Sequence, residues 1–276
     1  MSDESSMFVN GQPTTFISAS DRGLVLGDGF FTTIHLKNGM PLFWDYHQTR
    51  LVQHAKKLGF PEPDTSSLKQ QLVSLIPDGE TGSICGKIII TRGAGGRGYS
   101  PSGCLKPTSI VSLHPYPSQY VEWQKAGIDI GICDLRLGIQ PMLAGLKTLN
   151  RLEQVLLKEE LEQKNLAEAL VLNATEHVVE CVTANLFWRK NKQIFTPILD
   201  HSGVCGTMRM AILERLRSEK IQVHQVKADL SDVLSADELW ISNALMGVVP
   251  VRAVNQQQFK ESKSARWLQN EFEKTI

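Results

Sequence analysis

A chain of 276 residues is long enough for one large or two medium domains, each with its own core. Lys and Arg together number 29 and balance 29 Asp and Glu, which argues against a nucleic acid or a membrane surface as partner. The polar start, the lack of an apolar run near the roughly 20 residues that span a bilayer, and scattered cysteines without CxxC spacing predict a soluble cytoplasmic protein with neither disulfides nor a metal site.

The N-terminal part of the chain carries a hairpin signal followed by a helix signal. Residues 30–43 predict two strands around Asn38-Gly39, because both positions of a tight hairpin turn favour residues that tolerate positive φ. The helix is predicted to begin at Asp45, in a capping box with Gln48, and to end at Gly59.

Two β-branched runs, 86–91 and 109–113, predict further strands. The segment His114-Pro-Tyr-Pro-Ser then breaks the pattern and is typical of a linker. We therefore expect a smaller N-terminal α/β domain over residues 1–114, a linker over 115–120 and a larger C-terminal domain over 121–276.

The C-terminal part begins with a predicted strand over 127–133. Asn150 with Glu153 predicts the start of a helix that runs to about Lys164. Its apolar side chains are expected to face inward: Leu152, Val155 and Leu156. The later predicted elements are strands over 168–172, 177–181, 185–188, 193–195 and 238–242 and a helix over 208–218. Mixed elements in two halves indicate two α/β or α+β domains with the active site in the cleft between them.

The run Gly93-Ala-Gly-Gly-Arg-Gly98 follows a predicted strand and matches the GxGxxG pattern of dinucleotide sites. Such a site needs the loop to open a helix, and the following Tyr99-Ser-Pro-Ser-Gly cannot start a helix of useful length. We therefore reject a dinucleotide site. A glycine-rich loop with Arg97 and Tyr99 suits the wrapping of an anion, and the competing interpretation is a mobile surface loop.

Three residues have both a functional and a plain structural interpretation. Lys147 lies in a mostly apolar connection and is either a surface lysine or, when desolvated beside a cation, a nucleophilic amine. Thr207 is either a plain N-cap or part of a phosphate site at a helix N-terminus. Glu180 ends a strand, where an exposed carboxylate is the default.

In chain order, several segments resemble the fold-type IV pyridoxal-phosphate (PLP) enzymes, the class IV aminotransferase-like family. The resemblance covers nearly the whole chain. The segments that carry it are Asp21-Arg-Gly23, Gly27-Asp-Gly-Phe-Phe-Thr-Thr33, His47-Gln-Thr-Arg-Leu51, Lys147, Glu180-Cys-Val-Thr-Ala-Asn-Leu-Phe187, Gly206-Thr-Met-Arg209 and Ala236-Asp-Glu-Leu-Trp-Ile-Ser-Asn-Ala244.

The resemblance implies pyridoxal 5'-phosphate as cofactor, bound by the larger domain. Lys147 matches the family's lysine that holds the cofactor covalently, and Glu180 matches the carboxylate that pairs with the pyridinium nitrogen. Arg50 matches the phosphate-binding arginine, helped by backbone N–H groups at Thr207 and Met208.

Two positions depart from the family's pattern. Asn243-Ala244 stands where the family commonly has a threonine on the phosphate, so that only a backbone N–H or the Asn amide is left to serve there. Met208 likewise replaces a frequent threonine. The departures weaken individual contacts and leave the class unchanged.

Within the family, three segments are similar to the aminodeoxychorismate lyases: Gly95-Gly-Arg-Gly-Tyr-Ser100, the run from Leu143 to Val155, and Ala184-Asn-Leu-Phe-Trp-Arg-Lys190. This implies a lyase that converts 4-amino-4-deoxychorismate to 4-aminobenzoate and pyruvate, in which Lys147 removes the C4 proton. Because that substrate is a dicarboxylate, polar and cationic side chains are expected around it. The residues expected to bind it are Phe31, Thr33, His35, Arg97, Tyr99 and Arg136.

Two alternatives stay open from the sequence. One is a transaminase of the same fold that acts on a D- or branched-chain amino acid, and the other is a PLP-carrying protein without catalysis. The family further implies a homodimer in which a loop of the partner closes the active site. The apolar residues expected at the interface are Phe30, Phe31 and Trp44.

Overall fold

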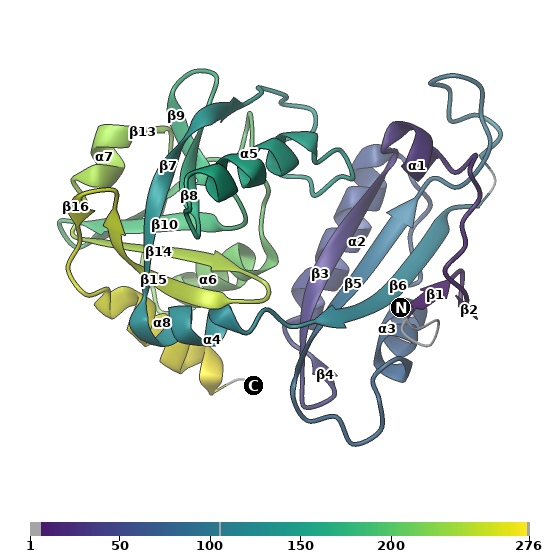
Figure 1. Ribbon diagram of the computed structural model, residues 1–276, viewed down its shortest axis with the longest axis horizontal. Coiled ribbons are helices and arrows are strands. Elements are labelled where there is room, and N and C mark those ends of the chain that lie inside the picture. The colour runs from purple at the N-terminus through teal and green to yellow at the C-terminus, as the bar shows by residue number, and fades with distance from the viewer. Residues whose placement is uncertain (1–6, 105, 275–276) are drawn as a thin grey trace. The chain divides into compact units, whose positions relative to one another are not determined.

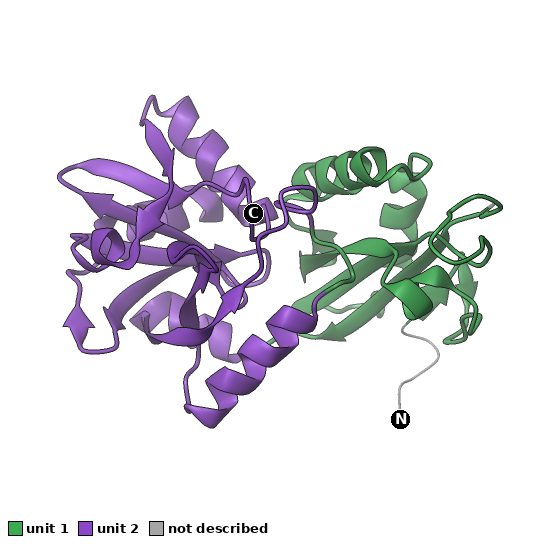
Figure 2. Ribbon diagram, turned by 90° about the horizontal axis from the view of Figure 1, so that it is seen from above, with its two compact units in different colours: residues 1–117, 147–150 green, residues 118–146, 151–276 purple. Residues whose placement is uncertain are grey.

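The computed structural model describes residues 7–104 and 106–274. The chain divides into two compact units, coloured green and purple in Figure 2. Unit 1 comprises residues 1–117 together with 147–150, and unit 2 comprises residues 118–146 and 151–276. In the described part of the chain, no helix is both long enough and apolar enough to cross a membrane.

The elements of unit 1 are β1 (Met7–Val9), β2 (Gln12–Pro13), α1 (Arg22–Leu26), β3 (Gly29–Lys37), β4 (Met40–Pro41), α2 (Trp44–Leu58), α3 (Thr65–Ser74), β5 (Ser83–Thr91) and β6 (Thr108–Pro115). The strands form a six-stranded sheet of order β2-β1-β6-β5-β3-β4 within the described residues. Helix α2 packs on β3, and α3 packs on β5 and β6, so that both helices cover the same face of the sheet (Figure 1). The predicted strands and helix of this half are confirmed.

The turns of this unit follow from residue types that tolerate positive φ. Asn38 and Gly39 have φ of 51° and 75°, as the hairpin prediction requires. Helix α2 ends at Gly59, whose φ of 67° makes it a left-handed C-cap. The predicted capping box is wrong, because Phe43 is the N-cap and Asp45 lies inside the first turn, where its charge complements the helix dipole.

The side chains of strand β3 point alternately to the buried core face and to a partly open face of the sheet. Phe31, Thr33 and His35 are half-buried and share the partly open face. Phe30 (0% exposed) and Trp44, the first residue of α2, lie in the apolar core of unit 1. The expectation that Phe30 and Trp44 form a subunit interface is therefore wrong.

The elements of unit 2 are α4 (Gln119–Ala126), β7 (Ile128–Leu137), α5 (Leu152–Gln163), β8 (Ala169–Asn173), β9 (His177–Cys181), β10 (Asn185–Lys190), β11 (Gln193–Pro197), α6 (Thr207–Ser218), β12 (Val223–Val226), β13 (Ala228–Asp229), α7 (Leu230–Leu234), β14 (Glu238–Asn243), β15 (Gly247–Val254), β16 (Gln257–Gln258) and α8 (Lys263–Glu273). All predicted elements of this half are present. Several other elements were not predicted, among them β15 and α8.

The strands of unit 2 form a ten-stranded mixed sheet within the described residues, of order β12-β11-β10-β14-β15-β7-β8-β9-β13 with β16 beside β15. Strand β9 also contacts β10 and β11, so the sheet curls around one apolar core. Helices α4 and α8 pack on β15, α5 on β7, and α6 on β12 and β14 (Figure 1). The fold is thus the expected two-unit arrangement of mixed sheets and helices.

Helix α5 buries a different stripe from the predicted one. Leu157 and Leu161 face β7, whereas Leu152 is 72% exposed and Val155 and Leu156 are also exposed. The predicted cap is wrong as well, because Arg151 is the N-cap and the Glu153 carboxylate accepts a hydrogen bond from the Gly138 N–H. The sequence has two apolar stripes on this helix, and β7 covers only one of them.

Candidate active site

Lys147 belongs to a short extended segment that lies along β3 of unit 1. The N–H of Phe31 donates to the Lys147 carbonyl at 3.0 Å, and the Leu149 N–H donates to the Gly29 carbonyl at 3.0 Å. Asn150 closes the segment by donating its amide to the Gly27 carbonyl. Residues 147–150 therefore follow β3, although both neighbouring parts of the chain belong to unit 2. The backbone of Lys147 is fixed on a rigid sheet.

The Lys147 side chain lies over the open face of β3. Its Nζ is 4.5 Å from the centroid of the Phe31 ring, which is a cation–π distance. The Nζ of Lys87, on the neighbouring β5, is 5.1 Å from the same centroid. Thr33 stands directly opposite Lys87 in the register. The structure thus places Lys147 and Lys87 beside Phe31, with Thr33 opposite Lys87 on the neighbouring strand.

Sequence reasoning missed Lys87, although a signal was present. It is a single charged residue inside the β-branched run Gly86-Lys-Ile-Ile-Ile-Thr91, and alternation places it on the open face of the sheet. A second cation within reach of Phe31 suits an anionic substrate.

His35 lies farther along the same face. It is four residues from Phe31, or about 13 Å along a strand. Its ring stacks on Tyr116 at 4.6 Å, and its Nε2 is hydrogen-bonded to the Ser83 hydroxyl at 2.9 Å. Burial first, and the charge of Lys37 second, lower the pKa of His35 to about 4, so the ring is neutral at pH 7. This side chain has structural partners at the far end of β3.

Arg50 is a buried cation on α2 that is hydrogen-bonded to a residue of β3. Its Nη1 donates to the Thr32 hydroxyl at 3.3 Å, and this hydroxyl shares a 2.6 Å hydrogen bond with Nδ1 of His47. Burial, and then the charge of Arg50, lower the pKa of His47 well below its ordinary value. The neutral imidazole therefore orients Thr32 and Arg50 without adding a competing charge. A buried arginine placed in this way is suited to an anionic group.

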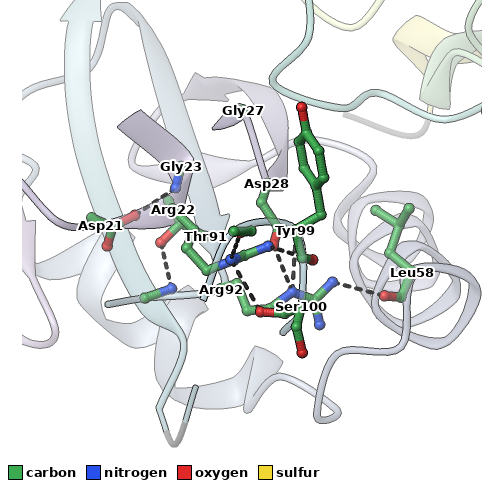
Figure 3. Close-up of polar contacts among 12 residues, drawn as sticks. Asp21, Arg22, Gly23, Gly27, Asp28, Leu58, Thr91, Arg92, Tyr99 and Ser100 are labelled. Carbon is green, nitrogen blue, oxygen red and sulfur yellow. Dashed lines mark hydrogen bonds and ion pairs between the residues drawn. The ribbon is translucent and has the colours of Figure 1, made fainter. Parts of the chain in front are cut away.

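The glycine-rich loop carries Arg97 and Tyr99 at its exposed tip. Tyr99 is 89% exposed and Arg97 is also exposed. No helix follows the loop within residues 99–104, so the loop does not lead into the helix N-terminus that a dinucleotide site needs. Figure 3 shows that the Arg22 side chain contacts the backbone of this loop and is paired with Asp28. The loop is therefore held by side chains from elsewhere in the fold.

Glu180 is a buried carboxylate on β9 of unit 2, not the exposed residue of the default interpretation. It is 6% exposed, and its Oε2 accepts a hydrogen bond from the Val204 N–H at 2.8 Å. Two arginines, Arg151 and Arg209, interact with its charge. A fixed, buried acceptor of this kind suits a protonated heterocyclic nitrogen.

The N-terminus of α6 lies a few residues beyond Val204. Gly206 is the N-cap, and a Cβ on it would meet Oδ1 of Asn185 at 2.1 Å, so that only glycine fits. Asn185 holds this segment at both ends, because it accepts from the Gly206 N–H at 3.0 Å and donates to the Val204 carbonyl at 2.8 Å. Glu180 and the start of α6 are thereby connected through one short loop.

Two buried hydroxyls near this helix end lack a hydrogen-bond partner among the described residues. Thr207 is 2% exposed, and it follows the N-cap, so its interpretation as a plain N-cap is wrong. Ser242 is fully buried and stands directly opposite Asn185 on β14. The first N–H groups of a helix also lack internal acceptors. The helix N-terminus and the two hydroxyls together fit a bound phosphate. Ser242 was not among the predicted site residues.

The departures at Met208 and Asn243 are explained by local packing. The Met208 side chain is buried, so this residue presents only its N–H to the helix end. The side-chain Oδ1 of Asn243 accepts from the N–H groups of Leu245 and Met246, and its Nδ2 donates to the Thr183 carbonyl. Because the Asn243 side chain is used in this turn, only backbone N–H groups such as that of Ala244 are left to contact a phosphate here.

Arg136 is engaged elsewhere in unit 2. Its guanidinium donates to both carboxylate oxygens of Glu176 and to the carbonyl groups of Cys133 and Asp134. The hydrogen bonds from this guanidinium to Glu176 raise the pKa of Arg136. The structure gives this side chain a structural role at the end of β7.

A protein-family model described as amino-transferase class IV matches residues 29–254 of this chain. An aminodeoxychorismate lyase of Vibrio harveyi is 43% identical over 266 residues, which cover 95% of this chain and 97% of that relative. The crystal structure of a 4-amino-4-deoxychorismate lyase from Pseudomonas aeruginosa matches with a TM-score of 0.90 and 35% identity, covering 98% of this chain and 99% of that one. A branched-chain amino acid aminotransferase of Escherichia coli shares the fold, with a TM-score of 0.86 at 21% identity over 98% of this chain and 93% of that one.

Proposed function

The chain belongs to the amino-transferase class IV family, and from this premise we propose that it converts 4-amino-4-deoxychorismate to 4-aminobenzoate and pyruvate, with pyridoxal 5'-phosphate as cofactor. The observation that carries the proposal is the fixed placement of Lys147 on β3, in a chain that is 43% identical over nearly its whole length to an aminodeoxychorismate lyase. The similarity of the lyase from Pseudomonas aeruginosa supports the same reaction.

The residues present fit the cofactor. The buried hydroxyl of Thr207 at the start of α6, which has no hydrogen-bond partner among the described residues, would hold the phosphate with the N–H groups of Met208 and Ala244. Arg50 would neutralise the phosphate charge. Glu180 would pair with the pyridinium nitrogen, because its carboxylate is buried and fixed by the Val204 N–H. When bound, PLP supplies an electron sink for the pair released at C4 of the substrate.

Lys147 has two tasks in this reaction. Its Nζ would hold the cofactor covalently, and as a free amine it would take the proton from C4 of the substrate. Loss of this proton and of the enolpyruvyl ether gives 4-aminobenzoate and pyruvate, whose atoms together equal those of the substrate. The product ring is aromatic, so the step is downhill and needs no second substrate.

The substrate brings two carboxylates, and cations on unit 1 suit them. Lys87 stands on the open face of the sheet beside Phe31 and Thr33, and Arg97 stands at the tip of the glycine-rich loop. Tyr99 is exposed next to Arg97 and offers a hydroxyl. His35 and Arg136 have structural partners. We therefore assign substrate binding to Lys87, Arg97 and Tyr99.

We also assign a homodimer to the protein. The support is the exposed apolar stripe on α5, formed by Leu152, Val155 and Leu156 at helical spacing i, i+3 and i+4. A helix face of this kind is normally covered, and a second copy is the partner that the family's architecture implies. The cytoplasm is the compartment that suits a reduced thiol such as that of the half-exposed Cys104.

The test is turnover of the purified enzyme. Incubation with 4-amino-4-deoxychorismate is expected to produce 4-aminobenzoate, followed by its fluorescence, and one equivalent of pyruvate, while the cofactor stays in its pyridoxal form. A transaminase of the same fold would instead convert the cofactor stoichiometrically to pyridoxamine phosphate with an amino acid. That result without 4-aminobenzoate would overturn the proposal.

A further inference from the structure

Arg22 holds the glycine-rich loop by its backbone. The side chain is 7% exposed, and its Nε donates to Asp28 at 2.9 Å. Its two other nitrogens donate to three consecutive carbonyl oxygens, at 3.0 Å for Gly98, 3.1 Å for Tyr99 and 3.3 Å for Ser100 (Figure 3). The planar guanidinium thus connects a carboxylate on one side with a whole turn of the loop on the other.

Asp28 ties this arrangement to the rigid part of unit 1. Its carboxylate also accepts from Nε of Arg92, at 2.8 and 3.0 Å. Arg92 in turn donates to the carbonyl groups of Leu58 and Gly59, at the end of α2. Burial opposes the charge of Asp28, but the hydrogen bonds from Arg92 and Arg22 outweigh it and lower the pKa of this carboxyl. Arg22 is therefore anchored by a charged group that is itself fixed.

Within the described residues, few other polar contacts hold the tip of the loop, residues 95–100. Gly95, Gly96 and Gly98 all have positive φ, and glycine loses more conformational freedom on ordering than any other residue. A Cβ on Gly96 would lie 2.3 Å from the Ser100 carbonyl oxygen, so the tight turn requires glycine. Within the turn, the Ser100 N–H donates to the Arg97 carbonyl. The contacts from Arg22 offset the entropic cost of ordering this segment.

The three carbonyl groups point toward Arg22, while the side chains of Arg97 and Tyr99 are exposed. We propose that Arg22 is a positioning residue that, held by Asp28 and Arg92, keeps the glycine-rich loop in the conformation that presents Arg97 and Tyr99 to the substrate. The inference rests on the proposed function, in which Arg97 meets a substrate carboxylate. It adds a residue that acts on specificity without touching substrate or cofactor.

The first experiment compares Arg22→Lys with the wild-type holoenzyme. Lysine keeps the charge but cannot reach Asp28 and three carbonyl groups at once. We expect KM for 4-amino-4-deoxychorismate to rise about tenfold. In the variant the loop is ordered only when the substrate binds, and the free energy of ordering it weakens binding. We expect kcat to change by less than about threefold and the PLP spectrum to be unchanged. Amide exchange at Ser100 should become faster. Asp28→Asn serves as a second variant with the same expected direction.

The matched control is Arg252→Lys. Arg252 also forms a two-point pair with a carboxylate, that of Asp129, but it lies on β15 of unit 2. This variant should leave both KM and exchange at Ser100 as in the wild type. A structural effect common to any Arg→Lys change would appear in both variants.

The second experiment repeats Arg22→Lys in an Arg97→Ala background. If Arg22 acts through Arg97, the increase in KM caused by Arg22→Lys should largely disappear there. An undiminished increase overturns the inference, as does unchanged exchange at Ser100 in the single variant. Failure of the proposed function is separate: a wild-type enzyme that forms no 4-aminobenzoate refutes the reaction, while exchange at Ser100 still decides whether Arg22 holds the loop.

Discussion

The backbone N–H of Lys147 donates to Nε2 of His54 at 2.8 Å, across 93 residues of sequence. His54 is a buried residue of α2, and its ring packs against Phe30. With the Phe31 N–H bound to the Lys147 carbonyl, the peptide groups on both sides of the Lys147 Cα are fixed. The direction in which the Lys147 side chain leaves the sheet is therefore set by α2 and β3 together.

Replacing His54 is expected to impair the placement of Lys147. His54→Leu removes a buried acceptor, a loss of about 1–3 kcal/mol, and should lower turnover on the order of tenfold. His54→Gln retains a side-chain acceptor and should recover most of the rate. Turnover of the two variants at equal PLP occupancy measures the effect. Equal rates for Leu and Gln would show that the hydrogen bond does not matter.

Borohydride reduction of the holoenzyme is expected to attach the pyridoxyl group to Lys147. The visible absorption band of the bound cofactor should disappear on reduction, and peptide mass spectrometry should find the added mass on the peptide that contains Lys147. Lys87 provides an internal comparison, because its amine lies beside the same Phe31 ring. The label on Lys87 or on any other lysine would contradict the assignment.

Glu180→Gln is expected to lower kcat by roughly 100-fold or more, because the pyridine nitrogen loses its counter-charge and the ring accepts electrons poorly. Glu168→Gln is the matched control. Glu168 is also a buried carboxylate of unit 2, but it accepts hydrogen bonds from Ala169, Val182 and Thr183, and burial raises its pKa. The control should lower the melting temperature more than the rate. A normal rate in Glu180→Gln would mean that another residue faces the nitrogen.

Arg97→Ala is expected to lower kcat/KM with 4-amino-4-deoxychorismate tenfold to a hundredfold. This is the equivalent of about 1.5–3 kcal/mol for an arginine–carboxylate pair in a partly desolvated site. The PLP spectrum should stay intact, because cofactor contacts are assigned to other residues. Kinetics and absorption are measured on the same preparation. Unchanged efficiency removes Arg97 from the site, and a lost spectrum moves it to the cofactor.

The homodimer is tested at the exposed stripe of α5. Val155→Glu places a charge in the middle of that stripe and should shift the mass measured by light scattering from dimer to monomer at micromolar concentration. Lys158→Glu, on the same helix but outside the stripe, is the control and should leave the dimer intact. A fully active wild-type monomer would refute the assembly.

Local sequence signals determined the regular elements of this protein. Positive φ at Asn38 and Gly39 and the alternation along β3 depend on neighbouring residues, and both predictions are confirmed. The motifs around Lys147, Glu180 and Gly206 likewise indicated the family in their order along the chain, because each is a short run of side chains with a local role.

Only the tertiary structure decided which apolar face of helix α5 is buried. Helix α5 has two apolar stripes, and only packing on β7 selects Leu157 and Leu161 over Leu152 and Val155. Periodicity is the same for both stripes, so no sequence pattern distinguishes them. The predicted cap at Asn150 failed for a related reason, because Asn150 donates to the Gly27 carbonyl and Glu153 accepts from the Gly138 N–H.

The same holds for the parts of the site that come from distant positions. Residues 147–150 join unit 1 because backbone groups of β3 pair with them, and Arg22 reaches carbonyl groups that lie 76 to 78 positions away. Backbone hydrogen bonds between distant segments cannot be predicted from residue types, since every non-proline residue offers the same N–H and C=O. The sequence by itself determined which chemical groups the protein has and which elements carry them, whereas only the packed chain decided how the backbone of Lys147 and of the glycine-rich loop is held.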